Sequence, residues 1–134
     1  MAMKKKPRAK AAKSRRRGLG PFDYLIKIVG GRVVIDGENG GNVRARGQPF
    51  VKFVRDASTV PRFKITCTEF RYNNESDAEP AWAFSGTAPT GWLTEFRRQL
   101  RRPEKGASQL VFKYTIEADV AGSIAADPII IIDR

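Results

Sequence analysis

The first 17 residues hold nine lysine and arginine residues and no acidic residue. Such a segment buries too little apolar surface to offset the entropy lost on folding, and its like charges repel one another. A folded domain must therefore come from the remaining 117 residues, in which 16 basic residues stand against 14 acidic ones. We predict a disordered basic arm and hinge over residues 1–20, with chain breakers at Gly18, Gly20 and Pro21, and a single domain over residues 21–134.

Most of the domain shows the alternation of apolar and polar residues that is typical of half-buried strands. The clearest examples are the segments 22–29 and 110–120. Four consecutive isoleucines at 129–132 predict a strand that is buried on both faces. The glycine-rich segment 37–41 predicts a hairpin loop. Further strands are predicted over residues 32–36, 42–46 and 50–54, and a longer one over residues 63–72. Residues 82–85 are expected to form a short strand or an extended segment.

One segment has a helical period instead. Trp92, Phe96 and Leu100 recur every four residues, Thr90 is a suitable N-cap, and Pro103 stops a helix. Arginines in the last turns would favour the helix dipole. The sequence therefore predicts a mainly β protein: a β-sandwich or partly open barrel of about seven to eight short strands with one crossover α-helix.

The basic residues are the candidate binding site, because cations that neutralise phosphates release counterions from nucleic acid. Two sets qualify, one in the arm and one on the expected helix, where spacing by four would place pairs of arginines along one face. They are Lys4, Lys5, Lys6, Arg8, Lys10, Lys13, Arg15, Arg16 and Arg17, and then Arg97, Arg98, Arg101 and Arg102. The arm also fits a nuclear localisation signal, a solubilising tail or a membrane-surface contact.

Aromatic residues lie among these cations and could stack on bases. Periodicity favours core packing for Trp82, Phe84, Trp92 and Phe96, whereas Tyr72, beside Arg71 at a strand end, is the aromatic expected to be exposed.

Catalytic and metal chemistry find little support. The chain has no histidine and one cysteine, Cys67, which is expected to be a small core residue. The acidic loop 73–79 lacks the spacing of a calcium-binding loop. We therefore expect no enzyme activity, no catalytic residue, no metal and no cofactor. No apolar stretch is long enough to span a membrane, and no apolar signal sequence follows the basic start, so an intracellular location is expected, cytoplasmic or, in a eukaryote, nuclear.

These observations predict a non-enzymatic protein that binds DNA or RNA through its basic arm without reading the base sequence, with the four later arginines as auxiliary contacts. The alternative is a structural or assembly module. Its domain would contact a protein partner or form a homo-oligomer, and the basic tail would serve for localisation or packaging.

Overall fold

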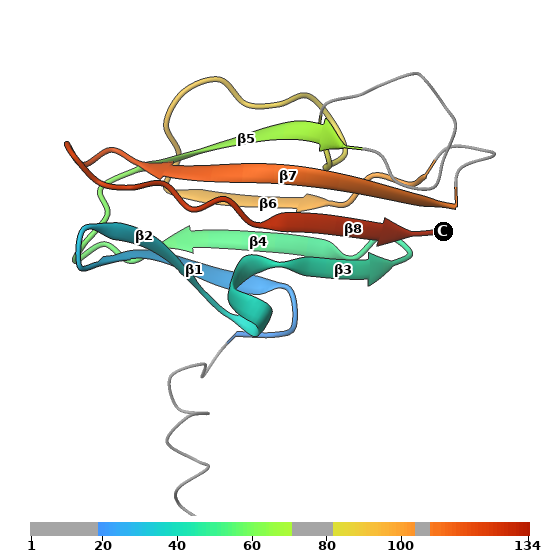
Figure 1. The fold of residues 1–134 in the computed structure, drawn as a ribbon, viewed down its shortest axis with the longest axis horizontal. Helices are drawn as coiled ribbons and strands as arrows, with labels where there is room; N and C mark the ends of the chain where they lie inside the picture. The colour runs from blue at the N-terminus through green and yellow to red at the C-terminus, as the bar shows by residue number, and fades with distance from the viewer. Residues whose placement is uncertain (1–18, 71–81, 104–107) are drawn as a thin grey trace, which may run out of the picture.

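A computed structural model describes residues 19–70, 82–103 and 108–134, and these form a mainly β protein with two sheets and no closed barrel (Figure 1). The prediction of a mainly β protein is therefore confirmed, and its strands form two mixed sheets. The strands are β1 (Asp23–Val29), β2 (Arg32–Asp36), β3 (Val43–Arg46), β4 (Phe50–Arg55), β5 (Phe63–Phe70), β6 (Glu95–Gln99), β7 (Gln109–Ala118) and β8 (Ile129–Asp133). The basic arm, Tyr72 and the acidic loop 73–79 lie outside the described residues.

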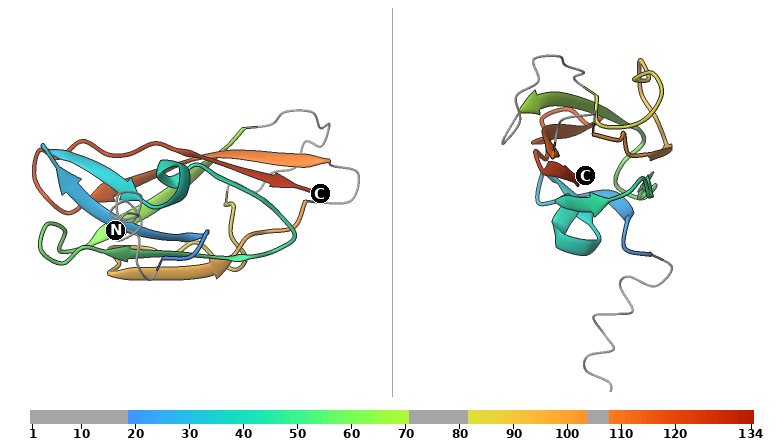
Figure 2. Two further views of the ribbon diagram at one scale, coloured as in Figure 1. Left: turned by 90° about the horizontal axis from the view of Figure 1, so that it is seen from below. Right: turned by 90° about the vertical axis from the view of Figure 1, so that its right-hand side faces the viewer.

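Both sheets have four strands and mixed direction. The first sheet has the order β2-β1-β4-β6 and the second has the order β3-β8-β7-β5. β1 pairs with β4, and β3 pairs with β8, in parallel, while the other pairs are antiparallel. Figure 2 shows the C-terminus at one end of the molecule and the turn between β1 and β2 at the opposite end. The two ends therefore present different loops.

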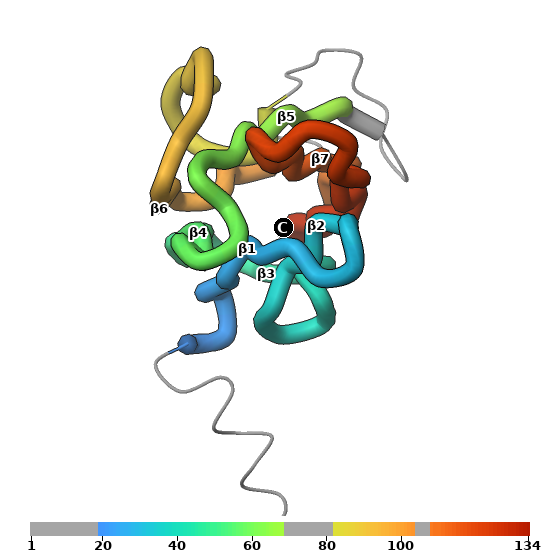
Figure 3. The backbone as a smooth tube through the Cα atoms, turned by 90° about the vertical axis from the view of Figure 1, so that its left-hand side faces the viewer, coloured from blue at the N-terminus to red at the C-terminus, as the bar shows by residue number. Residues whose placement is uncertain are grey.

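The inner faces of the two sheets share one apolar core. Viewed along the strands, β4 and β1 lie on one side of this core, and β5 and β7 lie on the other (Figure 3). Phe53 of β4 lies at its centre, with ring centroids 5.4 Å from Tyr24 in the same sheet and 5.7 Å from Tyr114 in the other. Alternation explains this placement, because Val51 and Phe53 are fully buried while Phe50 and Lys52, which alternate with them along β4, face outward.

The isoleucine run forms β8, which lies between β3 and β7 in the second sheet. Ile130 and Ile132 are fully buried, whereas Ile129 and Ile131 are half-buried on the outer face. The prediction of burial on both faces is therefore wrong, although β8 is a central strand of its sheet. Cross-strand neighbours shelter the outer isoleucines in part, and no second layer covers them among the described residues.

The predicted helix over Thr90–Arg102 is wrong, because this segment contains β6 and no α-helix is found in the described residues. Phe96 and Leu100 are buried, which satisfies a spacing of four as well as a spacing of two. A strand uses the period of two through Phe96, Arg98 and Leu100 on one face. Arg98 replaces the apolar residue that would have revealed this period.

The predicted hairpin loop over residues 37–41 is a crossing between sheets, since β2 belongs to the first sheet and β3 to the second. It contains the 3-10 helix η1 (Glu38–Gly41). Gly41 has φ of +93°, and a Cβ there would lie 2.9 Å from the Ile35 side chain. The buried Tyr114 hydroxyl donates a hydrogen bond to the Gly41 carbonyl. This bond fastens the crossing to β7.

We predict that Gly41→Ala and Tyr114→Phe each destabilise the fold. The first adds a strained backbone and a clash with Ile35, and the second leaves a buried carbonyl without its donor, a loss of about 1–3 kcal/mol. Urea denaturation measures both. Gly47→Ala is the matched control, because Gly47 also has positive φ but has open space around it. Equal losses for the two glycine variants would show that the Ile35 contact contributes nothing.

Candidate nucleic-acid interface

The structure does not bring the four later arginines onto one surface. Arg97 and Arg98 are neighbours in β6 and point to opposite faces, while Arg101 and Arg102 follow the end of the strand. The prediction that each pair spaced by four lies along one helical face is therefore wrong. Arg97 and Arg98 alternate within β6 while Arg101 and Arg102 lie beyond it, and the contacts of the four arginines divide them into two groups with different surroundings.

Arg98 and Arg101 hold the backbone of the preceding loop. The Arg98 guanidinium donates to the carbonyls of Ser85 at 3.0 Å and Thr87 at 2.9 Å. Arg101 Nε donates to the Trp82 carbonyl at 2.9 Å. Both side chains are half-buried. These bonds tie residues 82–87 to β6 and to the segment that follows it, and this is a structural role.

Arg97 has a different setting on the outer face of the first sheet. Its guanidinium carbon lies 4.0 Å from the centre of the Phe50 ring. Lys52 is directly opposite Arg97 in the pairing of β4 with β6, so two cations and an aromatic ring share this face. Phe50 is 45% exposed even with Arg97 over it.

Arg102 continues this surface at the end of β6 through two glutamines. Phe50 is opposite Gln99, and the Gln99 amide donates to the Gln48 carbonyl at 3.1 Å. The Arg102 guanidinium in turn donates to Gln48 Oε1 at 3.0 Å. We call the surface formed by Phe50, Lys52, Arg97 and Arg102 the basic strip. None of its three cations forms an ion pair with an acidic residue in the described chain.

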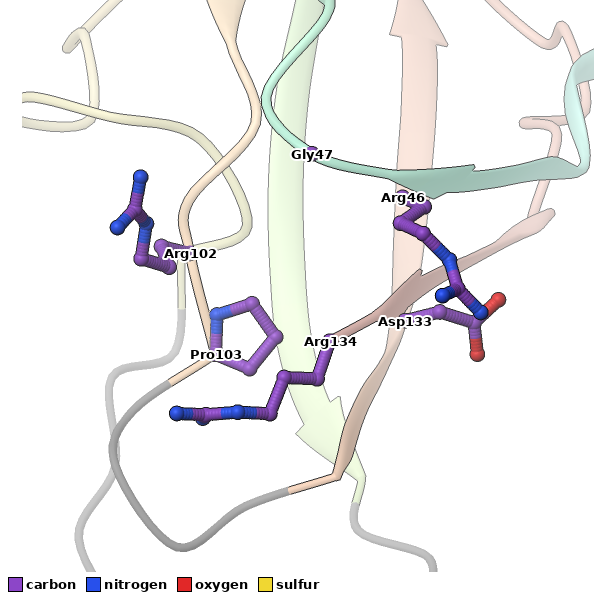
Figure 4. Close-up of a pocket in the computed structure, with 6 residues that line it drawn as sticks. All are labelled: Arg46, Gly47, Arg102, Pro103, Asp133 and Arg134. Carbon is purple, nitrogen blue, oxygen red and sulfur yellow. The ribbon is translucent and has the colours of Figure 1, made fainter.

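A pocket of about 290 Å³ lies beside Arg102, at the same end of the molecule. It is lined by Arg46, Gly47, Arg102, Pro103, Asp133 and Arg134 (Figure 4). The guanidiniums do not converge on one point: Arg46 extends toward Asp133, while Arg102 and Arg134 extend the other way, on either side of Pro103. The pocket adds positive charge to this end, but its arginines do not form a cage around a single anion.

Asp133 is the one carboxylate in this pocket and it is already partnered. Arg44 donates to its two oxygens at 2.8 and 3.1 Å, and Gln109 donates at 2.9 Å. The hydrogen bonds from Arg44, followed by those from Gln109, hold the pKa of Asp133 below its usual value. The carboxylate is therefore charged at neutral pH, and Arg44 offsets its charge.

Several other cations of the domain are paired with acids. These ion pairs join Lys27 to Asp36, Arg44 to Asp133, Arg62 to Asp119 and Lys113 to Asp127. In each pair the aspartate offsets the charge of its cation. Lys52, Arg97 and Arg102 belong to none of these pairs, and a count of charges along the sequence does not reveal which cations are paired.

The first described residues enter the domain next to the strip. The backbone N–H of Lys52 donates to the Phe22 carbonyl at 2.9 Å, and Asp23 is the β1 partner of Lys52. The Asp23 carboxylate accepts a bond from the Gly20 N–H at 2.9 Å, which fixes the turn before β1. The arm residues Lys4 to Arg17 lie outside the described residues, but their point of attachment is beside Lys52.

The core role predicted for Trp82, Phe84 and Phe96 is confirmed, since all three are buried. Trp92 is only half-buried, and the Lys64 ammonium lies 4.4 Å from its ring centre. Sequence reasoning missed Phe50. The sequence does contain a signal for the exposure of Phe50. If Val51 and Phe53 face inward in a strand, Phe50 must face outward.

The Cys67 thiol and groups of metal-ligating side chains are the other chemical features that the described residues could offer. Burial raises the pKa of the half-buried Cys67 thiol to about 11, so little thiolate is present at neutral pH. Over residues 19–70, 82–103 and 108–134, no group of three or more acidic, cysteine or histidine side chains is placed to hold a metal ion. In the same segments no helix has the length and apolarity needed to cross a bilayer.

Comparison with protein-family models, with curated proteins and with solved structures finds no match to this chain.

We predict that Arg98→Gln and Arg101→Gln each lower the free energy of unfolding by about 1–3 kcal/mol, because loop carbonyls lose charged donors. Arg97→Gln is the matched control: it also removes one charge from β6, and its exposed side chain should cost less than about 1 kcal/mol. Urea denaturation of the three variants checks this. Equal stability of Arg97→Gln and Arg98→Gln would contradict the structural role.

Proposed function

We propose that the protein is a non-enzymatic binder of DNA or RNA that uses the basic arm and the basic strip together. The arm supplies nine cations without an acid among them, and the strip supplies Lys52, Arg97 and Arg102. Cations of this kind contact phosphates, which are the same in every nucleotide, so the binding is independent of base sequence. Arg98 and Arg101 are left out of the interface because their donors hold the loop.

The observation that carries this proposal is that the chain enters the domain beside Lys52 of the strip. Arg17 is five residues from Phe22, whose carbonyl is bonded to Lys52. An extended chain of that length spans at most about 18 Å, which is about five nucleotide spacings along one strand of a duplex, so Arg17 stays within that distance of Phe22. One polyanion can therefore contact both, and the tether makes the second contact effectively intramolecular.

We predict that deleting residues 1–17 weakens binding to nucleic acid severely and flattens its salt dependence, because most phosphate contacts are lost. Fluorescence anisotropy with a labelled oligonucleotide, titrated at several salt concentrations, measures both effects. Lys52→Gln combined with Arg102→Gln should reduce the slope of log affinity against log salt by about 1–2.

Arg32→Gln is the control for the strip variants. It removes an exposed cation at the far end of β1 and β2 and should leave the slope unchanged. A truncated protein that keeps the full affinity and slope would refute the role of the arm. A double variant with the slope of the Arg32→Gln control would remove the strip from the interface.

A second candidate function is assembly, and one observation favours it. Val29, Val120 and Ile124 are exposed apolar residues, and Ile124 is hydrogen-bonded to Gly31 at the turn between β1 and β2. This turn lies at the end of β1 away from the strip. Light scattering after nuclease treatment at high salt tests assembly. An oligomer that becomes monomeric on Ile124→Ser would support it, and a monomeric parent protein would exclude it.

A further inference from the structure

We infer that the strip takes single-stranded nucleic acid in preference to duplex, with a base stacked against the Phe50–Arg97 pair. This inference rests on the proposed function and specifies the ligand of the same surface. It starts from Phe50, an aromatic side chain that is exposed on the outer face of the first sheet. A phenyl ring exposed on the flat outer face of a sheet is a suitable platform for a base.

The neighbours of Phe50 complete such a platform. The Arg97 guanidinium lies 4.0 Å from the centre of the ring, close enough for the two groups to stack. A guanidinium is itself planar, and its free face can carry a base in the same way as an aromatic ring. Phe50 remains 45% exposed beneath it, so apolar surface is available at the edge of the pair.

Phosphate contacts are available on both sides of this stack. Lys52 is opposite Arg97 on one side, and Arg102 follows through Gln48 and Gln99 on the other. A strand whose base stacks at Phe50 can therefore place its backbone along Lys52 and Arg102. In a duplex the faces of the bases are covered by their neighbours, so this platform can contribute only when a base is unstacked.

Two acidic residues near Phe50 and Arg97 do not neutralise the cations of the strip. Asp23 is the β1 partner of Lys52, and its carboxylate accepts the Gly20 N–H bond. Glu95 lies on the same face of β6 and is opposite Val54, beyond Lys52 and Arg97. Neither acid forms an ion pair with Lys52 or Arg97 in the described chain.

The test uses the full-length protein and two probes of equal length, a labelled oligothymidylate of about 20 nucleotides and a duplex of the same length. Phe50→Ala should weaken binding to oligothymidylate between about fivefold and a hundredfold, the range for one lost base stack. Binding to the duplex should change by less than about twofold, because phosphate contacts remain.

Three further variants separate stacking from folding and from general apolarity. Phe50→Trp should retain or tighten binding to oligothymidylate, whereas Phe50→Leu, which keeps apolar bulk without a ring, should resemble Phe50→Ala. Val29→Ala is the matched control, since Val29 is an exposed apolar residue at the other end of β1, and it should have no effect. Thermal melting confirms that each variant is folded before its affinity is compared.

The outcomes distinguish this inference from the function on which it rests. If Phe50→Ala binds oligothymidylate like the parent, or weakens both probes equally, the stacking inference is wrong while nucleic-acid binding stands. If the parent protein binds neither probe at low salt, the proposed function itself is wrong. Loss of binding to oligothymidylate alone, with rescue by Phe50→Trp, supports the inference.

Discussion

The packing of Phe53 against Tyr114, with ring centroids 5.7 Å apart, joins the two sheets at the centre of the core. Both residues are fully buried, and burying a side chain of this size contributes about 1.5–3 kcal/mol. Because β4 alternates, an inward Phe53 also requires Phe50 and Lys52 to face outward. One strand thus supplies the centre of the core and half of the basic strip. A shift of β4 by one residue would bury a lysine and expose Phe53.

The distribution of charge matters more for the proposed function than its total. The domain by itself is almost neutral, and four of its cations are paired with aspartates. Exposed charges are screened over about 8 Å at physiological salt, so cations act mainly on ligands that touch them. Lys52, Arg97 and Arg102 lie together without acidic partners among the described residues, next to the point where the arm is attached. The arm and the strip would therefore reinforce each other on one polyanion.

The sequence predicted the strands with clear alternation, because β1 and β7 place apolar side chains on one face over a long run. It failed at β6, where Arg98 occupies an inward position and its guanidinium bonds to loop carbonyls, so that the period of two was hidden. No local pattern distinguishes this arginine from Arg97, which is exposed. Whether each arginine is half-buried or exposed depends on the loop that packs beside the strand. For the same reason the hairpin expected at residues 37–41 became a crossing between sheets: the partner of β3 is β8, more than 80 residues later.

The most direct test of the account is a map of the bound surface by NMR, with the full-length protein and a short oligothymidylate. We predict that the largest changes in backbone amide shifts occur at Phe50, Lys52, Arg97 and Arg102, together with the arm residues. The amide shifts of Val29 and Ile124, which lie at the turn between β1 and β2, should remain unchanged. Changes confined to the arm, or centred on the turn between β1 and β2, would contradict the account.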